Sequence, residues 1–374
     1  MAVVGLYAGI GGFELGFQAA GFDTLLLAEK DPYCRQVLAE HFGKVELAAD
    51  VADVKALPAD TSVVTAGFPC QNLSMAGDKV GLHGTKTGDV RHMFDLIGRG
   101  SRPTLAIENV YFLLHVARGN AMRQLVESIE ELGYRWAYRV VNTLAFGLPQ
   151  RRRRVFFVAS MTLDPRTVLF ADEHGAPPAS PATLDKPIGF YWTEGRAGVG
   201  TTVDGVPPIK VASTVGIPSA PAVLFPDGAV LTPSIDACER LQGFRPGWTN
   251  FDYETRRSPR WRMVGNAVSV PAAQWLAGRI NEPGEMLDLP SRPLAEGSSW
   301  PAAAYGSESG PVGVEASEFP ICEPPPSIEA FRDENWRPLS ARALRGFIHR
   351  AKEGKLRFPK GFLAALEDAL RRVE

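Results

Sequence analysis

The sequence of 374 residues lacks the features that mark membrane-spanning and secreted proteins. No window approaches the roughly 18 consecutive apolar residues that a transmembrane helix needs. The first six residues, Met1 to Leu6, lack the basic flank and the cleavage site of a signal peptide, so we expect a cytoplasmic protein. No internal repeat is visible.

Cysteine and excess charge are also scarce. Four cysteines stand far apart, at positions 34, 70, 238 and 322, without a Cys-x-x-Cys pair, and the six histidines are scattered. A disulfide framework and a metal site are therefore not expected. The formal net charge is only −2, so any polyanion would have to be held by local basic clusters rather than by overall charge.

Residues 1–160 alternate short apolar runs with helical patterns, which is typical of an α/β domain. The first apolar run leads through glycines into a helix that Gly21 should end, and Asp31 with Pro32 should begin the next helix. The sequence therefore predicts a doubly wound, mostly parallel sheet. The strands are expected near 3–8, 24–28, 63–66, 105–107, 136–141 and 155–159, with a further helix across 120–132.

The texture of the sequence changes after residue 160. Residues 161–229 are rich in Gly, Pro, Thr and Val and predict a small β-rich region. A helical pattern returns in 230–282, with Thr232 and Pro233 as cap and first turn, and we expect it to rejoin the first domain.

The last part of the chain divides into a spacer and a helical module. Residues 283–327 are rich in Pro, Gly and Ser and are expected to form a linker. Residues 328–374 predict a C-terminal helical extension with a basic excess and helices over 340–352 and 361–373. This module either contacts nucleic acid, docks onto the core or packs on its own aromatic side chains.

A glycine-rich run from Tyr7 to Glu14 lies where the first strand should give way to a helix. Glycines there let a ligand approach the backbone, and the helix N-terminus favours polar ligand groups. The spacing is not Gly-x-Gly-x-x-Gly, so a dinucleotide dehydrogenase fits poorly, and a purely structural turn is an equal interpretation. Glu29 after the second strand could bind a ribose and Asp50 an adenine, which together favour an adenosine-bearing cofactor.

Cys70 lies in the turn Gly67-Phe68-Pro69-Cys70-Gln71, directly after an expected strand. A cysteine is more often an inert buried residue, which is our interpretation for Cys34 and Cys238. Beyond a strand end the sulfur can instead project into a cleft and act as a nucleophile once deprotonated. Glu108 follows the next apolar strand, where partial burial would raise its pKa and let it share a proton.

A basic run, Gln150 to Arg154, enters the strand expected over 155–159. Alternate side chains of a strand share a face, so Arg152 and Arg154 should project together. Neighbouring guanidiniums repel unless they face an anion or a polar ligand. We therefore interpret them as a pair aimed at the cleft, with a solvated strand start as the alternative.

Taken in this order, the motifs resemble the C5-cytosine DNA methyltransferase family, in its prokaryotic or phage type, over most of residues 3–282. Tyr7 stands where the family usually has Phe, and the C-terminal module departs from the family pattern. The matching segments are the glycine turn, Pro69-Cys70-Gln71, Glu108-Asn109-Val110, Gln150-x-Arg152-x-Arg154, the helix from Leu231 to Phe244, and Gly265-Asn266-Ala267-Val268.

The resemblance implies the S-adenosylmethionine-dependent methyltransferase fold and a site for that cofactor, without a metal. The implied cofactor-binding residues are Tyr7, Gly9, Ile10, Gly11, Gly12, Glu29, Asp50, Pro69, Asn266 and Val268. It also implies that Cys70 attacks C6 of a cytosine flipped out of duplex DNA, that Glu108 grips the base edge, and that Arg152 and Arg154 hold the base.

Several residues are expected to contact DNA. The glycine-rich stretch 74–91 should form a lid over the nucleophile, and residues 161–229 occupy the family's target-recognition position, with Thr201, Thr202, Arg196 and Lys210 as candidate contacts. The expected DNA-binding residues are Gln71, Ser74, Lys79, Lys86 and Arg91 in and beside the lid, and Arg256, Arg257 and Arg260 as phosphate contacts.

Other functions remain open at this point. A tRNA cytosine methyltransferase would use the same chemistry, although the insert after residue 160 favours double-stranded DNA. A catalytically silent DNA-binding module would need none of Cys70, Glu108, Arg154 and the glycine turn. The sequence also does not show whether a cognate restriction endonuclease acts separately on the same site.

Overall fold

The computed structural model describes residues 1–68, 88–178, 183–211, 221–253 and 259–374. The chain folds into two compact bodies and passes between them more than once. No helix in these described ranges is long and apolar enough to cross a membrane. The first body comprises Met1–Asn142, Arg153–Ala176 and Val268–Cys322, and the second comprises Thr143–Arg152, Pro177–Ala267 and Glu323–Glu374.

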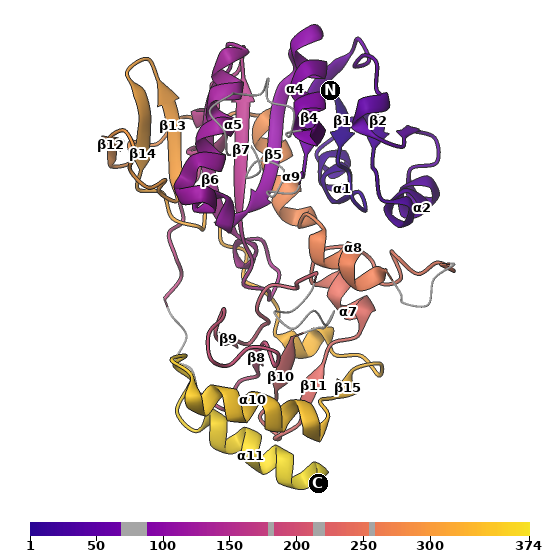
Figure 1. Ribbon diagram of the computed structural model, residues 1–374, viewed down its shortest axis with the longest axis vertical. Coiled ribbons are helices and arrows are strands. Elements are labelled where there is room, and N and C mark those ends of the chain that lie inside the picture. The colour runs from indigo at the N-terminus through magenta and orange to yellow at the C-terminus, as the bar shows by residue number, and fades with distance from the viewer. Residues whose placement is uncertain (69–87, 179–182, 212–220, 254–258) are drawn as a thin grey trace. The chain divides into compact units, whose positions relative to one another are not determined.

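The first body is built on one sheet, in which ten strands are described, with the order β12-β14-β13-β6-β7-β5-β4-β1-β2-β3 (Figure 1). Strands β1 to β5 pair with one another in parallel, and β7 is antiparallel to both of its neighbours, β5 and β6. The predicted doubly wound α/β fold is therefore confirmed. The bounds of these strands are Ala2–Leu6 (β1), Asp23–Ala28 (β2), Glu46–Ala48 (β3), Thr61–Ala66 (β4), Thr104–Val110 (β5), Arg135–Asn142 (β6) and Arg153–Ser160 (β7).

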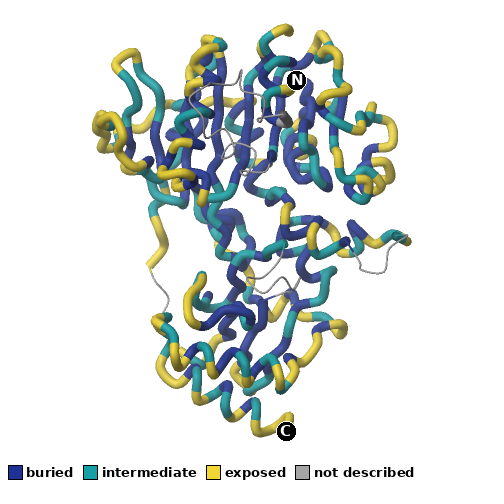
Figure 2. The backbone as a smooth tube through the Cα atoms, viewed as in Figure 1, coloured by how far each residue is buried: buried dark blue, intermediate teal, exposed yellow. Residues whose placement is uncertain are grey.

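Helices flank the sheet, whose central strands are buried along nearly their whole length (Figure 2). Asp31 caps α2 by accepting a hydrogen bond from the N–H of Tyr33, with Pro32 in the first turn, as predicted. Gly21 takes a φ of 85° just after α1 ends, as a helix stop requires. The helices of this body are Gly12–Ala19 (α1), Pro32–His41 (α2), Gly88–Arg99 (α4), Asn120–Glu131 (α5), Arg166–Leu169 (α6) and Val270–Asn281 (α9).

Residues 283–327 do not form the expected linker. They supply β12 (Ser291–Pro293), β13 (Ala303–Ser307) and β14 (Gly310–Val314), which extend the sheet beyond β6 through the antiparallel pairing of β13 with β6. Trp300 is buried and donates a hydrogen bond to the carbonyl of Gly119 over 3.0 Å. The prediction was wrong because proline and glycine are compatible with short edge strands, so composition alone did not exclude a hairpin.

The second body contains a smaller antiparallel sheet in the order β15-β11-β10-β8-β9. Its strands are Ile188–Phe190 (β8), Thr202–Val203 (β9), Ala222–Leu224 (β10), Val230–Thr232 (β11) and Arg337–Pro338 (β15), and its helices are Ile235–Arg240 (α7), Arg260–Asn266 (α8), Ala341–Glu353 (α10) and Phe362–Val373 (α11). The helices α10 and α11 match the predicted pair. They pack against this sheet, since the rings of Phe347 and Phe362 lie 4.7 and 5.3 Å from that of Phe190.

Three expected boundaries therefore change. Residues 328–374 form part of the second body and not a separate module. The return to the first body comes at Val268, not at residue 230, and residues 161–176 stay with the first body. Thr232 lies in β11, and Ser234 is the residue that caps α7, through its hydroxyl to the N–H of Ala237.

A buried carboxyl lies beneath the first turn of α1. Glu14 is fully buried, and its Oε1 accepts a hydrogen bond from the Thr65 hydroxyl over 3.2 Å. A side chain on Gly5 would collide with this carboxyl, since a Cβ there would lie 2.1 Å from Glu14 Oε1. Burial raises the pKa of Glu14 to about 7, in spite of the hydrogen bonds that it receives.

We expect Glu14 to make stability fall as the pH rises. The folded protein keeps the Glu14 proton up to a pKa of about 7, whereas the unfolded chain releases it near the ordinary 4.5. Over that window the folded state loses up to about 3 kcal/mol relative to a Glu14→Gln variant, which cannot titrate. Urea unfolding of both proteins at pH 5 and pH 8 checks this; an equal change in both would contradict it.

Candidate active site

The antiparallel pairing of β5 with β7 brings an acid and an arginine together. Val110 at the end of β5 pairs with Arg154 near the start of β7. Arg154 Nε lies 2.9 Å from Glu108 Oε1, and the two side chains are 16% and 8% exposed. The predicted burial of Glu108 is thus confirmed. Burial lowers the pKa of Arg154, and the Glu108 carboxylate opposes that shift.

Asn109 ties this site to the strand end that precedes Cys70. Its Nδ2 donates a hydrogen bond to the carbonyl of Phe68 over 2.9 Å, and its Oδ1 accepts one from the N–H of Val110. Phe68 is the last residue described before Pro69 and Cys70. The sequence analysis gave Asn109 no role, although its place between Glu108 and Val110 in the motif could have indicated one.

Part of the predicted site lies outside the described residues. This applies to Pro69, Cys70, Gln71, Ser74, Lys79 and Lys86, and to Arg256 and Arg257. Arg91, expected to border the lid, lies within α4, with its Nε 3.6 Å from the Asp95 carboxylate. Cys238 is fully buried and burial raises the pKa of its thiol, in agreement with the inert role predicted for it.

The glycine turn has the geometry of a ligand cradle. Gly9 has a φ of 58°, and a Cβ on it would meet no atom of the described residues within 4 Å, so none of them crowds this backbone. The N–H of Gly9 donates to Glu29 Oε2 over 2.8 Å, and the N–H of Asp31 donates to Glu29 Oε1 over 2.7 Å. Burial raises the pKa of Glu29 on balance. A carboxylate has about four lone-pair sites, so Glu29 can also accept the hydroxyls of a ribose.

The remaining cofactor candidates surround this turn or lie apart from it. Asp50 is half-buried and forms an ion pair of 3.3 Å with Lys30. Burial raises the pKa of the Asp50 carboxyl, but the hydrogen bonds that it accepts from the Ala52 N–H and from Lys30 outweigh burial and lower this pKa overall. Val268 lies beside Gly67, 3.8 Å from where a Cβ would be. In the turn itself, Tyr7 is half-buried with a φ of 56°, Gly11 has a φ of 85°, and Ile10 and Gly12 are buried. Asn266 is exposed and belongs to the second body.

Arg152 does not share the role predicted for Arg154. It lies in the second body and is 1% exposed. Its guanidinium donates to the carbonyls of Ile209, Gly265 and Ala267 over 2.9, 3.1 and 2.8 Å. The prediction was wrong because β7 begins only at Arg153, so the strand alternation that would pair Arg152 with Arg154 does not reach it.

Two buried glutamines complete this network in the second body. Gln150 donates to the Leu241 carbonyl over 2.8 Å and accepts from the N–H of Ile209 over 3.0 Å. Gln242 donates to the Val264 carbonyl over 2.9 Å. Sequence reasoning missed Gln242, although it lies within the helix motif from Leu231 to Phe244. Together with Arg152, these side chains fix the backbone around the motif residues Gly265-Asn266-Ala267.

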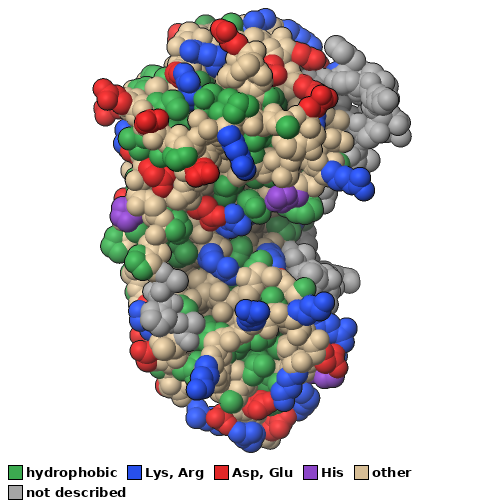
Figure 3. Space-filling view, turned by 90° about the vertical axis from the view of Figure 1, so that its left-hand side faces the viewer, with side chains coloured by type: hydrophobic (Ala, Val, Ile, Leu, Met, Phe, Trp, Pro, Cys, Tyr) green, Lys and Arg blue, Asp and Glu red, His purple; other side chains and the backbone are tan. Residues whose placement is uncertain are grey.

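Several residues expected to contact DNA have partners within the protein. Arg260 lies between Asp236 and Glu239, 2.6 and 3.0 Å away, so its charge is already balanced. In the proposed recognition region Lys210 pairs with Glu194, and Arg196 lies 2.6 Å from Glu353 on α10. Lys and Arg side chains are interspersed with Asp and Glu on the face shown in Figure 3, in keeping with the low net charge.

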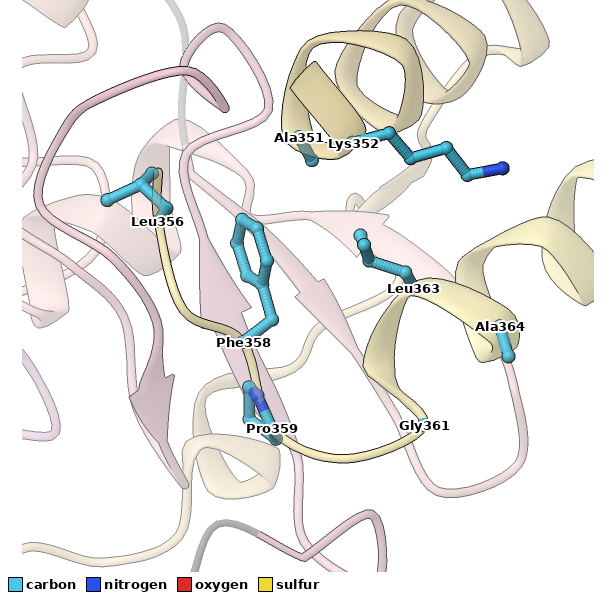
Figure 4. A pocket seen from close by; sticks show the side chains of 8 residues that line it. All are labelled: Ala351, Lys352, Leu356, Phe358, Pro359, Gly361, Leu363 and Ala364. Carbon is cyan, nitrogen blue, oxygen red and sulfur yellow. The ribbon is translucent and has the colours of Figure 1, made fainter. Parts of the chain in front are cut away.

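A cavity of about 540 Å³ lies in the second body between α10 and α11. Its lining is mostly apolar, and the side chains of Phe358 and Leu363 point into it (Figure 4). None of the predicted site residues lines it. The cavity is therefore not part of the candidate active site.

Comparison with known proteins decides the family. A model of the family described as C-5 cytosine-specific DNA methylase matches residues 1–174. The Type II methyltransferase M2.BsuMI of Bacillus subtilis (strain 168) is 42% identical over 365 residues, which cover 94% of this chain and 93% of the relative. The chain belongs to the C-5 cytosine-specific DNA methylase family. It is an S-adenosylmethionine-dependent DNA cytosine-5 methyltransferase.

Other relatives agree with this assignment. The Type II methyltransferase M.HaeII of Haemophilus aegyptius is 29% identical over 74% of this chain and 92% of its own length. The crystal structure of the S. pombe Dnmt2 methyltransferase has the same fold, with a TM-score of 0.52 and 15% identity over 75% of this chain and 98% of that one. The predicted fold, enzyme class and cofactor are therefore confirmed, and a dehydrogenase and a silent binding module are excluded.

The buried network predicts that Arg152 serves stability. We expect Arg152→Met to lower the free energy of unfolding by about 3 kcal/mol, because three buried carbonyls lose their donor. Arg345→Met, at a residue whose side chain is 63% exposed, should change it by less than about 0.5 kcal/mol. Urea denaturation measures both. An Arg152→Met methylase that is as stable as wild type would contradict this role.

Proposed function

We propose that this methylase flips a cytosine out of duplex DNA, attacks its C6 with Cys70 and methylates its C5. The observation that carries the proposal is the buried ion pair of Glu108 with Arg154, joined through Asn109 to the backbone before Cys70. A base inside a stacked duplex exposes neither face of its ring to a protein group, so the reaction requires the base to leave the helix.

Cys70 is the nucleophile in this proposal. Cytosine C5 is a poor nucleophile until a group adds to C6, and thiolate addition there makes C5 resemble the carbon of an enamine. The sulfur–carbon bond forms as the ring electrons shift toward C5 and the base edge. Loss of the C5 proton after methylation re-forms the double bond and expels Cys70.

Glu108 stabilises the base edge while charge develops on it. When it carries a proton, the Glu108 carboxyl can donate a hydrogen bond to N3 of cytosine and accept one from the exocyclic amine. Its several lone-pair sites allow it to keep Arg154 while it binds the base. Arg154 acts as a positioning residue in this scheme, because it fixes the Glu108 carboxylate and balances its charge.

The glycine turn and its acids would hold the cofactor. The uncrowded backbone at Gly9 and the Glu29 carboxylate beside it fit a ribose, and the half-buried Asp50 fits an adenine amine. Val268 would close the pocket beside Gly67. When bound there, S-adenosylmethionine supplies an electrophilic methyl group.

DNA contacts fall to groups other than Arg260 and Arg152 in this proposal. Arg256, Arg257 and the lid residues Gln71, Ser74, Lys79, Lys86 and Arg91 would meet the phosphates and the flipped nucleotide. The second body would read the target sequence. A cognate restriction endonuclease that acts separately on the same sequence is the partner that Type II relatives suggest.

Bisulfite sequencing of DNA from cells that express the protein tests the function, because it reports the methylated base and its sequence context together. We expect protected cytosines within one recurring sequence. Labelled methyl transfer to the same duplex and to tRNA then compares the two substrates. Transfer to tRNA alone would overturn the proposal.

A Glu108→Gln variant should bind cofactor normally but turn over about 10²- to 10³-fold more slowly, because the amide stabilises the developing charge less well. Glu127→Gln, the same substitution at an exposed residue of α5, is the matched control and should keep most activity. Single-turnover methylation of duplex DNA measures both. Loss of less than tenfold in Glu108→Gln would argue against a role in the chemical step.

Duplex DNA carrying 5-fluorocytosine at the target should trap the enzyme, since fluorine at C5 cannot leave as a proton does. We expect a covalent complex, stable in denaturing gels, that Cys70→Ala abolishes. Cys322→Ala, at a half-buried cysteine of the first body, should trap as wild type does. Trapping that persists in Cys70→Ala would assign the nucleophile to another residue.

A further inference from the structure

A short segment next to the catalytic acid has a surface that the proposed chemistry does not use. After Val110 the chain continues directly into two 3-10 helices, η2 (Tyr111–Leu114) and η3 (Val116–Gly119). Phe112 is 63% exposed, more than any other large apolar side chain in the described parts of the chain. Phe112 lies four residues after Glu108, so the Cα atoms of the two residues are at most about 13 Å apart. This distance places Phe112 near the base that Glu108 is proposed to hold.

The backbone beneath Phe112 is firmly packed. Leu113, Leu114 and Val116 are buried in the core of the first body. Trp300 donates to the carbonyl of Gly119, and a Cβ on Gly119 would lie 3.0 Å from the Trp300 ring. Val110, before Phe112, pairs with Arg154 in the sheet, so the segment is anchored on both sides of Phe112 and the fold holds its exposed side chains in place.

The exposed side chains of this segment are aromatic and basic. The His115 ring lies 5.2 Å from that of Tyr111 and 6.5 Å from that of Phe112. Arg153 lies over Tyr111, 3.8 Å from the ring centre, and is also paired with Glu318, so Arg118 is the cation of the segment that we assign to DNA. Exposed Arg118 has a φ of 58° and its neighbour Ala117 one of 49°, a left-handed backbone that only a well-fixed segment holds in residues other than glycine.

We propose that this aromatic shelf, residues 111–118, is a DNA-contact surface, on which Phe112 packs against the DNA beside the target cytosine and Arg118 meets a phosphate. Aromatic side chains interleaved with cations fit nucleic acid, because rings stack on exposed bases while guanidiniums bind the backbone. A protein that bound Phe112 through apolar contacts alone would not require the positive charge of Arg118 beside it. This inference rests on the proposed function, since it needs DNA at Glu108.

The test compares Phe112→Ala with Met161→Ala, a 43% exposed apolar residue that follows β7 in the same body. Binding of duplex DNA that contains the methylated sequence is measured by fluorescence anisotropy at several salt concentrations. We expect the Kd of Phe112→Ala for DNA to rise about tenfold, with Phe112→Trp close to wild type, because stacking tolerates any large ring. Arg118→Ala should make the affinity for DNA less dependent on salt concentration, by the amount that the loss of about one phosphate contact predicts.

Two further measurements keep the outcomes separate. The Kd for cofactor should be unchanged in all variants, which shows that each one folds. DNA binding by Phe112→Ala equal to that of Met161→Ala would overturn the shelf, and so would a change only in self-association by sedimentation. If DNA binding depends on Phe112 but Cys70→Ala still methylates the DNA, the proposed function fails and the shelf stands.

Discussion

The antiparallel placement of β7 within an otherwise mostly parallel sheet is the constraint on which the candidate site depends. Glu108 lies near the end of β5 and Arg154 near the start of β7, and these two ends meet because the strands run in opposite directions. In a parallel arrangement with the strand starts aligned, Arg154 would lie three residues along the sheet from Glu108, roughly 10 Å away. The reversed strand therefore gives the buried acid its arginine partner.

The segment from Gln150 to Arg154 performs two tasks within five residues. Gln150 and Arg152 hold backbone groups around Ile209 and Gly265 in the second body, and Arg154 holds Glu108 in the first. The chain passes from the second body to the first between Arg152 and Arg153. Two residues of one short segment therefore hold the loop around Gly265 and the carboxylate of Glu108. This division of roles explains why Gln150, Arg152 and Arg154, although they stand at alternate positions, do not project from one face of a strand.

Much of the first body could be predicted because its signals are local. Apolar runs mark the central strands, and Asp31 with Pro32 and Gly21 mark helix ends through their own backbone preferences. The burial of Glu108 also followed from the four residues before it. The hairpin of residues 291–314 was missed because its strands are stabilised by β6 and Trp136, distant in sequence, and not by their own composition.

The partners of charged groups were the least predictable feature. Arg260 was expected to contact phosphate and Lys210 to contact DNA in the recognition region, but Glu239 and Glu194 lie beside them in the fold. Charge alone does not show whether an arginine faces solvent, an acid or a row of carbonyls. The resemblance to the family indicated the glycine turn and Cys70 as site residues. Only the structure distinguishes Arg152, which donates hydrogen bonds to backbone carbonyls, from Arg154, which pairs with Glu108.

The central claim is that Glu108 and Arg154 act as one unit, and a double-mutant cycle tests it most directly. Single-turnover methylation of duplex DNA is measured for Glu108→Ala, Arg154→Ala and the double variant, each with cofactor bound to saturation. The account predicts that the double variant is no more than about threefold slower than the slower single variant, because removal of either partner already disables the pair. Losses that multiply across the two substitutions would show that the residues act independently and would contradict the account.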